Sequence, residues 1–160
     1  RIMNQLHEPS VAALLVGKTS RANELGIRLT LDRESGLSED SDWLPPDAYV
    51  TIFGNLIENA IEVLNQSRSA TKEIFVSIRE NPDSLLLCVE DTGPGIPTVL
   101  RNTMFQRGAS TKGRHRGTGL SLVQEVVEAY HGDIRVESES GVGTSFFISF
   151  CREELPGEKE

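Results

Sequence analysis

The fold is decided by residues 84–95, which read SLLLCVEDTGPG. The run from Leu85 to Val89 is apolar without a break, which is typical of a strand in the centre of its sheet. Asp91 ends the strand, and a turn with two glycines follows it directly. Glycine has no Cβ, so the backbone of this turn can come close to a flat ligand beside the carboxylate. Because Asp-x-Gly is also common in ordinary turns, the stretch needs support from the rest of the chain.

Alternating apolar and polar residues predict further strands on both sides of this stretch. Residues 81–83, Asn-Pro-Asp, predict a hairpin turn between two of them, and Ser140-Gly141-Val142-Gly143 predicts a second. The predicted strands are 27–31, 73–80, 84–91, 133–139 and 144–151, with a short strand around Trp43 in the acidic loop 32–46. Because hairpins join successive strands, we expect a mixed, largely antiparallel sheet.

Three segments have the period of an amphipathic helix, residues 8–25, 46–65 and 117–131. The helix 46–65 has one apolar face, and its other face carries Asn55, Glu58, Asn59 and Glu62. The last helix has a predicted buried stripe of Leu120, Val123, Val127 and Tyr130, and Gly132 stops it. The order of elements predicts an α/β two-layer sandwich in which three helices cover one face of the sheet.

Composition places the chain among soluble globular domains. It has 160 residues, of which 38% are hydrophobic and 25% charged, close to the averages for a single folded domain. No apolar run comes near the ~20 residues of a membrane span. Cys88 and Cys151 lie in apolar stretches without metal-ligand spacing, which favours buried thiols in a reducing compartment over a zinc site or a disulfide framework.

The charge is distributed unevenly. Sixteen basic and 24 acidic residues give a net charge of −8, which argues against a general nucleic-acid binder. Residues 92–124 contain no acidic residue. Their five cations are Arg101, Arg107, Lys112, Arg114 and Arg116, so this segment carries +5 and the rest carries −8 − 5 = −13. A basic, glycine-containing segment in an acidic protein indicates an anion-binding loop.

Two further patterns point to nucleotide chemistry. Gly117-Thr118-Gly119-Leu120 begins the predicted third helix, where unpaired backbone N–H groups favour phosphate. Neither the P-loop pattern nor GxGxxG after a strand is present. Asn55 and Asn59 lie one turn apart in mid-helix, where asparagine is a mediocre helix former, and an amide oxygen of Asn59 can ligate Mg²⁺.

These segments, in this order, resemble the nucleotide-binding boxes of the superfamily that contains gyrase, heat-shock chaperone ATPases, mismatch-repair ATPases and histidine kinases, built on the Bergerat fold. The matching segments are Asn55–Ala60 as the N box, Asp91–Gly95 as the first Gly box, Phe105 with Gly108 as the F box, Gly117–Leu120 as the second Gly box and Gly141–Phe146 as a closing hairpin. The phrase FQRGASTKGRHRGTGLSLV is most similar to sensor histidine kinases of the citrate and C4-dicarboxylate type.

The resemblance implies ATP and Mg²⁺ as cofactors. It implies that Asp91 accepts a hydrogen bond from the adenine amino group, with help from Thr144, and that Asn59 ligates Mg²⁺. Residues 101–116 would form a lid over the nucleotide. The other implied nucleotide-binding residues are Gly93, Gly95, Lys112, Arg114, Arg116, Gly117, Thr118, Gly119 and Leu120, and the implied catalytic set is Asn55, Asn59 and Lys112.

Two positions depart from the family pattern. ATP-hydrolysing relatives carry a glutamate where this chain has Asn55, and an amide cannot act as general base toward water. Phosphotransfer to a protein side chain is therefore favoured over hydrolysis. Many histidine kinases have a lysine where this chain has Glu62, so the charge on the phosphates would be neutralised by the lid.

The resemblance also implies an organisation. Residues 1–25 would continue from a dimerisation region, residues 26–151 would form the ATP-binding catalytic domain, and residues 152–160 would be a disordered tail. His7-Glu8 imitates the start of a phosphoacceptor motif, but Pro9 breaks the match. The expected partners are a histidine phosphoacceptor domain of the same protein and a response regulator.

We further expect that this fragment alone is a monomer and that the full-length sensor is a homodimer. The fragment is expected to lie in the cytoplasm and outside the bilayer. The alternatives are an anti-sigma-type serine kinase and a non-catalytic module that binds nucleotide and transfers nothing.

Overall fold

The structure, a computed structural model, describes the backbone of residues 5–96 and 114–152 and the side chains of residues 5–96 and 119–152. Within these residues the helices are α2 (Pro9–Glu24), α3 (Pro46–Gln66) and α5 (Arg114–Ala129). The strands are β1 (Arg28–Leu31), β2 (Glu73–Glu80), β3 (Ser84–Asp91), β4 (Asp133–Glu139) and β5 (Gly143–Cys151). None of the described helices is long and apolar enough to cross a bilayer.

The strands form one five-stranded sheet in the order β1-β2-β3-β5-β4. β1 pairs with β2 in parallel, and the other three pairings are antiparallel. The predicted mixed sheet, with residues 84–91 at its centre, is therefore confirmed. The register places Asp91 opposite Thr144, so the end of β3 lies beside the start of β5.

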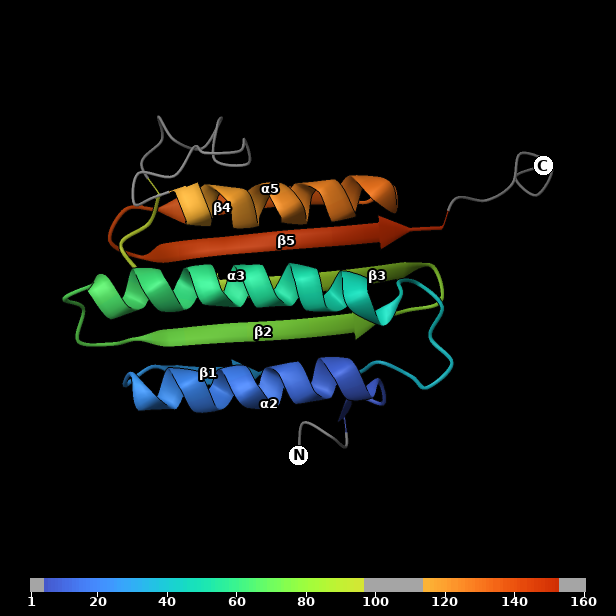
Figure 1. Cartoon of the computed structure of the whole chain (residues 1–160), viewed down its shortest axis with the longest axis horizontal. Coiled ribbons are helices and arrows are strands. Elements are labelled where there is room, and N and C mark those ends of the chain that lie inside the picture. The colour runs from blue at the N-terminus through green and yellow to red at the C-terminus, as the bar shows by residue number, and fades with distance from the viewer. Residues whose placement is uncertain (1–4, 97–113, 153–160) are drawn as a thin grey trace.

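The three described helices lie side by side on one face of this sheet, with α3 between α2 and α5 (Figure 1). Pro46 suits the first turn of α3, because a backbone N–H at this position would have no intrahelical partner and its absence costs no hydrogen bond. The apolar face of α3 fills the middle of the core with side chains that are at most 2% exposed, including Ile52, Phe53, Leu56, Ile57 and Ile61. The predicted α/β two-layer sandwich is confirmed.

The opposite face of the sheet is not covered by the described helices. In β3, Leu85, Leu87 and Val89 point into the core, whereas Leu86 is 41% exposed. The unbroken apolar run of this strand therefore reflects its central place rather than burial on both faces.

Several details of the sequence-based prediction are wrong, and the first two are the burial of Tyr130 and of Cys151. Helix α5 ends at Ala129, and Tyr130 is 42% exposed because it lies in the turn after the helix. His131 adopts a left-handed φ of 60° there, and the N–H of Gly132 bonds to the carbonyl of Val127, as in a Schellman motif. Cys151 is exposed at the end of β5, and both cysteines are free.

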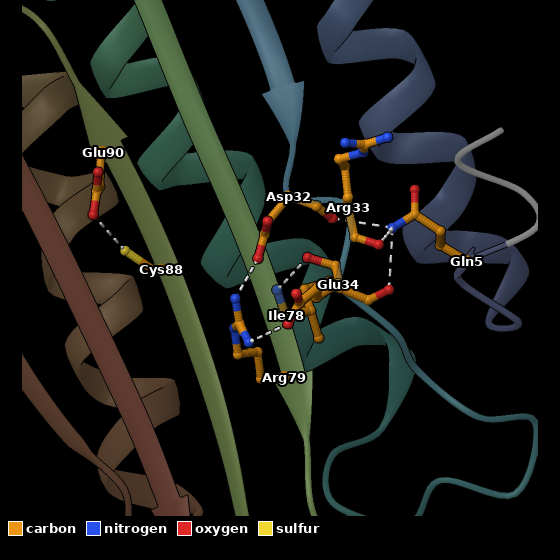
Figure 2. A network of polar contacts seen from close by, with 9 residues as sticks. Gln5, Asp32, Arg33, Glu34, Ile78, Arg79, Cys88 and Glu90 are labelled. Atoms are coloured by element: carbon orange, nitrogen blue, oxygen red, sulfur yellow. Dashed lines mark hydrogen bonds and ion pairs between the residues drawn. The ribbon is translucent and has the colours of Figure 1, made fainter.

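The third error is the short strand around Trp43, since residues 38–45 form no strand. The loop after β1 is held by an isolated bridge between Leu6 and Leu37 and by side chains. Gln5 Nε2 donates to three carbonyl oxygens of this loop, those of Asp32, Arg33 and Ser35, at 3.0 to 3.1 Å. Arg79, which lies on β2, forms ion pairs with Asp32 and Glu34 of this loop (Figure 2).

The far end of the same loop is held by the residue that follows β5. Arg152 lies 4.0 Å from the centre of the Trp43 ring and also bonds to Asp42. Its backbone N–H donates to the carbonyl of Asp83 at 3.1 Å. Arg152 thus belongs to the folded part, and residues 153–160 of the predicted tail lie outside the described residues.

Substitution of two glycines in the β4–β5 turn can test how closely β3 and β5 approach each other. Gly143 has φ 150°, and a Cβ at this position would lie 2.0 Å from the carbonyl oxygen of Asp91. We predict that Gly143→Ala lowers the free energy of unfolding by about 3 to 5 kcal/mol, because both strain and overlap are introduced. Urea denaturation measures this change.

Gly141→Ala is the matched control, because Gly141 also has a positive φ of 80° but a Cβ added there would have nothing within 4 Å. It is expected to cost only about 1 kcal/mol. Equal destabilisation by the two variants would contradict the close approach of the two strands.

Candidate functional site

Asp91 is the charged group that the fold buries at the end of the central strand. Its side chain lies on the helix-covered side of the sheet, and the residue is only 9% exposed. The backbone N–H of Gly93 donates to Asp91 Oδ1 at 2.8 Å. Burial raises the pKa of Asp91 from 3.8 to about 6, and hydrogen bonds from the backbone of Gly93 and Thr144 oppose this rise. The site therefore holds a carboxylate with few protein partners, which suits an acceptor for a ligand N–H.

The loop that follows Asp91 is fixed from both sides. Thr92 Oγ1 accepts from the backbone N–H of Glu73 at 3.0 Å, which ties the loop to the start of β2. On the other side, Ser138 Oγ accepts from the N–H of Ile96 at 2.7 Å and lies 3.1 Å from Thr144 Oγ1. Ser138 is a positioning residue that was not predicted from the sequence, because nothing in the local pattern of β4 distinguishes it from an ordinary strand serine.

Gly93 brings the loop into direct contact with α3. A Cβ at Gly93 would lie 2.8 Å from Cγ1 of Val63 and 2.9 Å from Asp91 Oδ1. Contacts this short leave no room for a side chain, so glycine is required at this point by packing. Gly95 has φ 90°, and a Cβ on this residue would lie 2.9 Å from the carbonyl oxygen of Glu139.

The polar face of α3 contacts α5 through Asn55. The Nδ2 of Asn55 donates to the carbonyl of Thr51 at 2.7 Å. On the side of α5, a Cβ at Gly119 would lie 2.8 Å from Asn55 Oδ1. The two predicted boxes that contain Asn55 and Gly119 are therefore in contact.

Asn59 lies between these two contacts. Asn55, Asn59 and Val63 follow one another at intervals of four residues and share one stripe of α3. One end of the stripe meets Gly119 and the other meets Gly93, about 12 Å apart along the helix. Asn59 is half-buried and has no hydrogen-bond partner among the described residues. Its amide oxygen is thus available to a hard cation from a position on α3 between the contacts with the two glycine-rich segments.

Glu58, the neighbour of Asn59, forms ion pairs with two residues of α2. Lys18 Nζ lies 2.9 Å from Glu58 Oε1, and Arg21 Nη2 lies 2.6 Å from Glu58 Oε2. The hydrogen bond from Arg21 is the main cause that lowers the pKa of Glu58, and Lys18 adds to it. Glu62 contributes, after Glu58, to raising the pKa of Arg21. Two cations of α2 therefore balance the acidic residues on this face.

The remaining predicted residues lie on α5 or in the segment before it. Helix α5 begins at Arg114, three residues before the predicted start, so Gly117 lies in its first turn. The first four N–H groups of the helix are those of residues 114–117, so the predicted row of unpaired N–H groups over residues 117–120 is confined to Gly117, and Thr118, Gly119 and Leu120 lie within the helix. The side chain of Leu120 is 6% exposed and packs in the core. Phe105, Gly108 and Lys112 lie outside the described residues, as do the side chains of Arg114, Arg116 and Thr118.

Residues 45–154 match the model of the family described as histidine kinase-, DNA gyrase B- and HSP90-like ATPase. A probable C4-dicarboxylate sensor kinase of Halalkalibacterium halodurans is 39% identical over 92% of this chain and 28% of that protein. Sensor histidine kinase DcuS of Escherichia coli is also 39% identical, over 92% of this chain and 27% of its own length.

The chain thus spans somewhat more than a quarter of these relatives. In a crystal structure of full-length ShkA in complex with AMPPNP, the matching part has a TM-score of 0.73 and 24% identity, and covers 93% of this chain and 31% of that one. The predicted resemblance to citrate and C4-dicarboxylate sensor kinases is confirmed by these comparisons.

The pKa of Asp91 gives a prediction about stability. Because the pKa is higher in the folded state, the folded chain binds the proton more tightly than the unfolded chain. The stabilisation from this proton is complete below pH 3.8 and is lost as the pH rises through about 6. We predict that Asp91→Asn raises the free energy of unfolding at pH 7 by about 1 to 3 kcal/mol. The asparagine Oδ1 still accepts from Gly93.

Urea denaturation of both proteins between pH 4 and pH 7.5 measures this effect, since the difference between them isolates one carboxyl group. The gap between the two curves is expected to widen with pH. A constant gap across this range would contradict a buried, ionised Asp91 in the folded chain.

Proposed function

The chain belongs to the histidine kinase-, DNA gyrase B- and HSP90-like ATPase family, and we propose that it binds Mg-ATP and donates the γ-phosphoryl group to a histidine on a separate phosphoacceptor and dimerisation domain of the same protein. The observation that carries the proposal is the stripe Asn55, Asn59 and Val63 on α3. It contacts both glycine-rich segments and leaves the Asn59 amide between them.

Each end of the site has a distinct task in this proposal. Asp91 accepts a hydrogen bond from the adenine amino group, with Thr144 beside it and the backbone of Gly93 and Gly95 close to the ring. Guanine presents a carbonyl where adenine presents the amino group, so it would leave the buried carboxylate unpaired, a mismatch worth ~1 to 3 kcal/mol. Adenine nucleotides are therefore preferred.

The phosphates lie toward α5 in this proposal. Asn59 holds Mg²⁺, which neutralises charge on the phosphates when it is bound. The first turn of α5, which ends at Gly117, offers unpaired N–H groups to the phosphates. Thr118, Gly119 and Leu120 continue the helix, where Gly119 has no side chain to obstruct the phosphates. Lys112, Arg114 and Arg116 supply positive charge. The described cations next to this face of α3, Lys18 and Arg21, are already paired with Glu58. The positive charge for the phosphates is therefore assigned to the segment before α5 and to its first turn.

The transfer itself requires positioning more than acid–base chemistry. A neutral imidazole nitrogen attacks the γ-phosphorus with its own lone pair, a P–N bond forms, and the bond to the oxygen of ADP breaks. Asn55 has no carboxylate to activate water, and its Nδ2 is already bound to Thr51. Transfer to a histidine is therefore favoured over hydrolysis.

The names of the relatives suggest the wider setting. We propose that the protein is the catalytic part of a two-component sensor related to C4-dicarboxylate and citrate sensors. In that setting residues 26–151 act as the ATP-binding domain in the cytoplasm, the whole sensor is a membrane-anchored homodimer, and the phosphoryl group passes on to a response regulator.

The first test is phosphotransfer in trans. The chain alone, incubated with γ-labelled ATP and Mg²⁺, is expected neither to label itself nor to release phosphate quickly. Addition of a dimerisation domain that carries its own His-Glu motif is expected to give label on that domain, stable to alkali and labile to acid. The control is the same domain with its phosphoacceptor histidine changed to alanine.

Other outcomes of this experiment favour other functions. Rapid ADP release that Asn55→Ala abolishes would replace the kinase by an ATPase. Acid-stable label on a serine of an added antagonist protein would favour the anti-sigma-type kinase. Tight nucleotide binding without transfer to either acceptor would favour a non-catalytic module.

The second test concerns the metal. We predict that Asn59→Ala weakens binding of ATP in the presence of Mg²⁺ about tenfold, or about 1.4 kcal/mol, and leaves binding in EDTA unchanged. The fold should survive, because alanine is the better helix former. Calorimetric titration with and without Mg²⁺ measures both affinities. Asn65→Ala is the matched control, since Asn65 is an exposed asparagine of the same helix. Normal Mg-dependent binding by Asn59→Ala would remove the metal role from this residue.

A further inference from the structure

We propose that Asn55 is a positioning residue. Its carboxamide packs against Gly119 of α5, and this contact sets the distance between the phosphate-binding turn of α5 and the face of α3 that carries Asn59. The inference rests on the proposed function, because it assigns Asn55 a task in the same nucleotide site. It replaces the expected catalytic role of Asn55 by a geometric one.

The orientation of the Asn55 side chain is fixed from within its own helix. Nδ2 donates to the carbonyl of Thr51 at 2.7 Å, one turn earlier in α3. An asparagine on a solvated face has several orientations available, whereas this bond selects one. The amide nitrogen is thereby turned back along α3, and Oδ1 is presented to α5.

Gly119 is the residue of α5 that meets this oxygen. A Cβ at Gly119 would lie 2.8 Å from Oδ1, 3.5 Å from Cγ and 3.8 Å from Cβ of Asn55. All three of these nearest atoms belong to one side chain, so Asn55 makes the closest contact in front of this glycine. The contact is made without a side chain on α5, which lets the two helices approach closely at this point.

The contact lies where it controls the site. Asn59 is one turn further along α3 than Asn55, about 6 Å along the helix axis. Gly119 lies two residues after Gly117, which ends the turn that faces the phosphates in the proposed function. The next residue, Leu120, is anchored in the core. A shift of α5 at Gly119 would therefore move the phosphate-binding backbone relative to Asn59 and leave the adenine end at Asp91 in place.

A double-mutant cycle tests this role. Gly119→Ala adds a methyl group where Asn55 Oδ1 now lies, and Asn55→Ala removes the carboxamide that it meets. Each single variant is expected to bind Mg-ATP more weakly, Gly119→Ala by about tenfold and Asn55→Ala by about threefold. The double variant is expected to bind more tightly than Gly119→Ala alone, because the new methyl group occupies the space that the carboxamide has left.

The measurement is competition against a fluorescent ATP analogue, with ATP and with adenosine as competitors, and urea denaturation of each variant without nucleotide. Adenosine affinity is expected to stay within about twofold of the wild-type value in all three variants, because the adenine end does not move. A purely structural defect would weaken both competitors together. Gly54→Ala is the matched control, since Gly54 adjoins Asn55 but a Cβ added to it would have nothing within 4 Å; its ATP affinity should equal that of the wild type.

Three results would overturn the inference while the wild-type chain still binds Mg-ATP. They are unchanged ATP affinity in Gly119→Ala, a double variant at least as weak as the product of the two single losses, and parallel loss of adenosine binding. If Gly119→Ala does not fold, the double variant must still bind ATP at least as tightly as Asn55→Ala. A wild-type chain that binds no Mg-ATP would instead overturn the proposed function, and the urea data alone would then report on the contact.

Discussion

The structure depends on one helix that has to satisfy two environments at once. α3 crosses the centre of the sheet between α2 and α5, fills the core with its apolar face and carries the polar residues of the candidate site on the other (Figure 1). Because a helix repeats every 3.6 residues, the two faces cannot move independently. The position of Asn59 is therefore set by the packing of Ile57 and Ile61, and any change that rotates α3 in the core would also rotate Asn59.

Three glycines adapt the neighbouring segments to this helix and to the central strand. Gly93 meets Val63, Gly119 meets Asn55, and Gly143 meets the carbonyl of Asp91, each at a distance that leaves no room for a Cβ. Such contacts have little tolerance, because a close-packed interior relaxes only partly around an added methyl group. The glycines that resemble family boxes in the sequence thus have a packing reason in this chain, separate from any contact with a nucleotide.

The acidic residues are treated in two opposite ways. Glu58 is paired with Lys18 and Arg21, and its pKa is lowered. Asp91 is buried with backbone N–H groups as its partners, and its pKa is raised to about 6. The first arrangement stabilises the contact between α2 and α3, whereas the second lowers stability at neutral pH and leaves a buried carboxylate with only backbone N–H donors beside it. A buried group that lowers the stability of the folded chain is a common feature of functional sites in proteins.

The sequence by itself determined the fold class, the central place of residues 84–91 and the polar face of the predicted helix 46–65, because hydrophobic period and turn residues are local properties of the chain. It did not locate the end of α5 before Tyr130, where a left-handed residue closes the helix. Nor did it show the contacts that hold the loop after β1, because these involve residues distant in sequence such as Gln5, Arg79 and Arg152. Only the tertiary structure decided that Asn55 meets Gly119 and that Ser138 supports the loop after Asp91. Such contacts join separate segments, and the register and helix packing that create them leave no periodic signal in either segment alone.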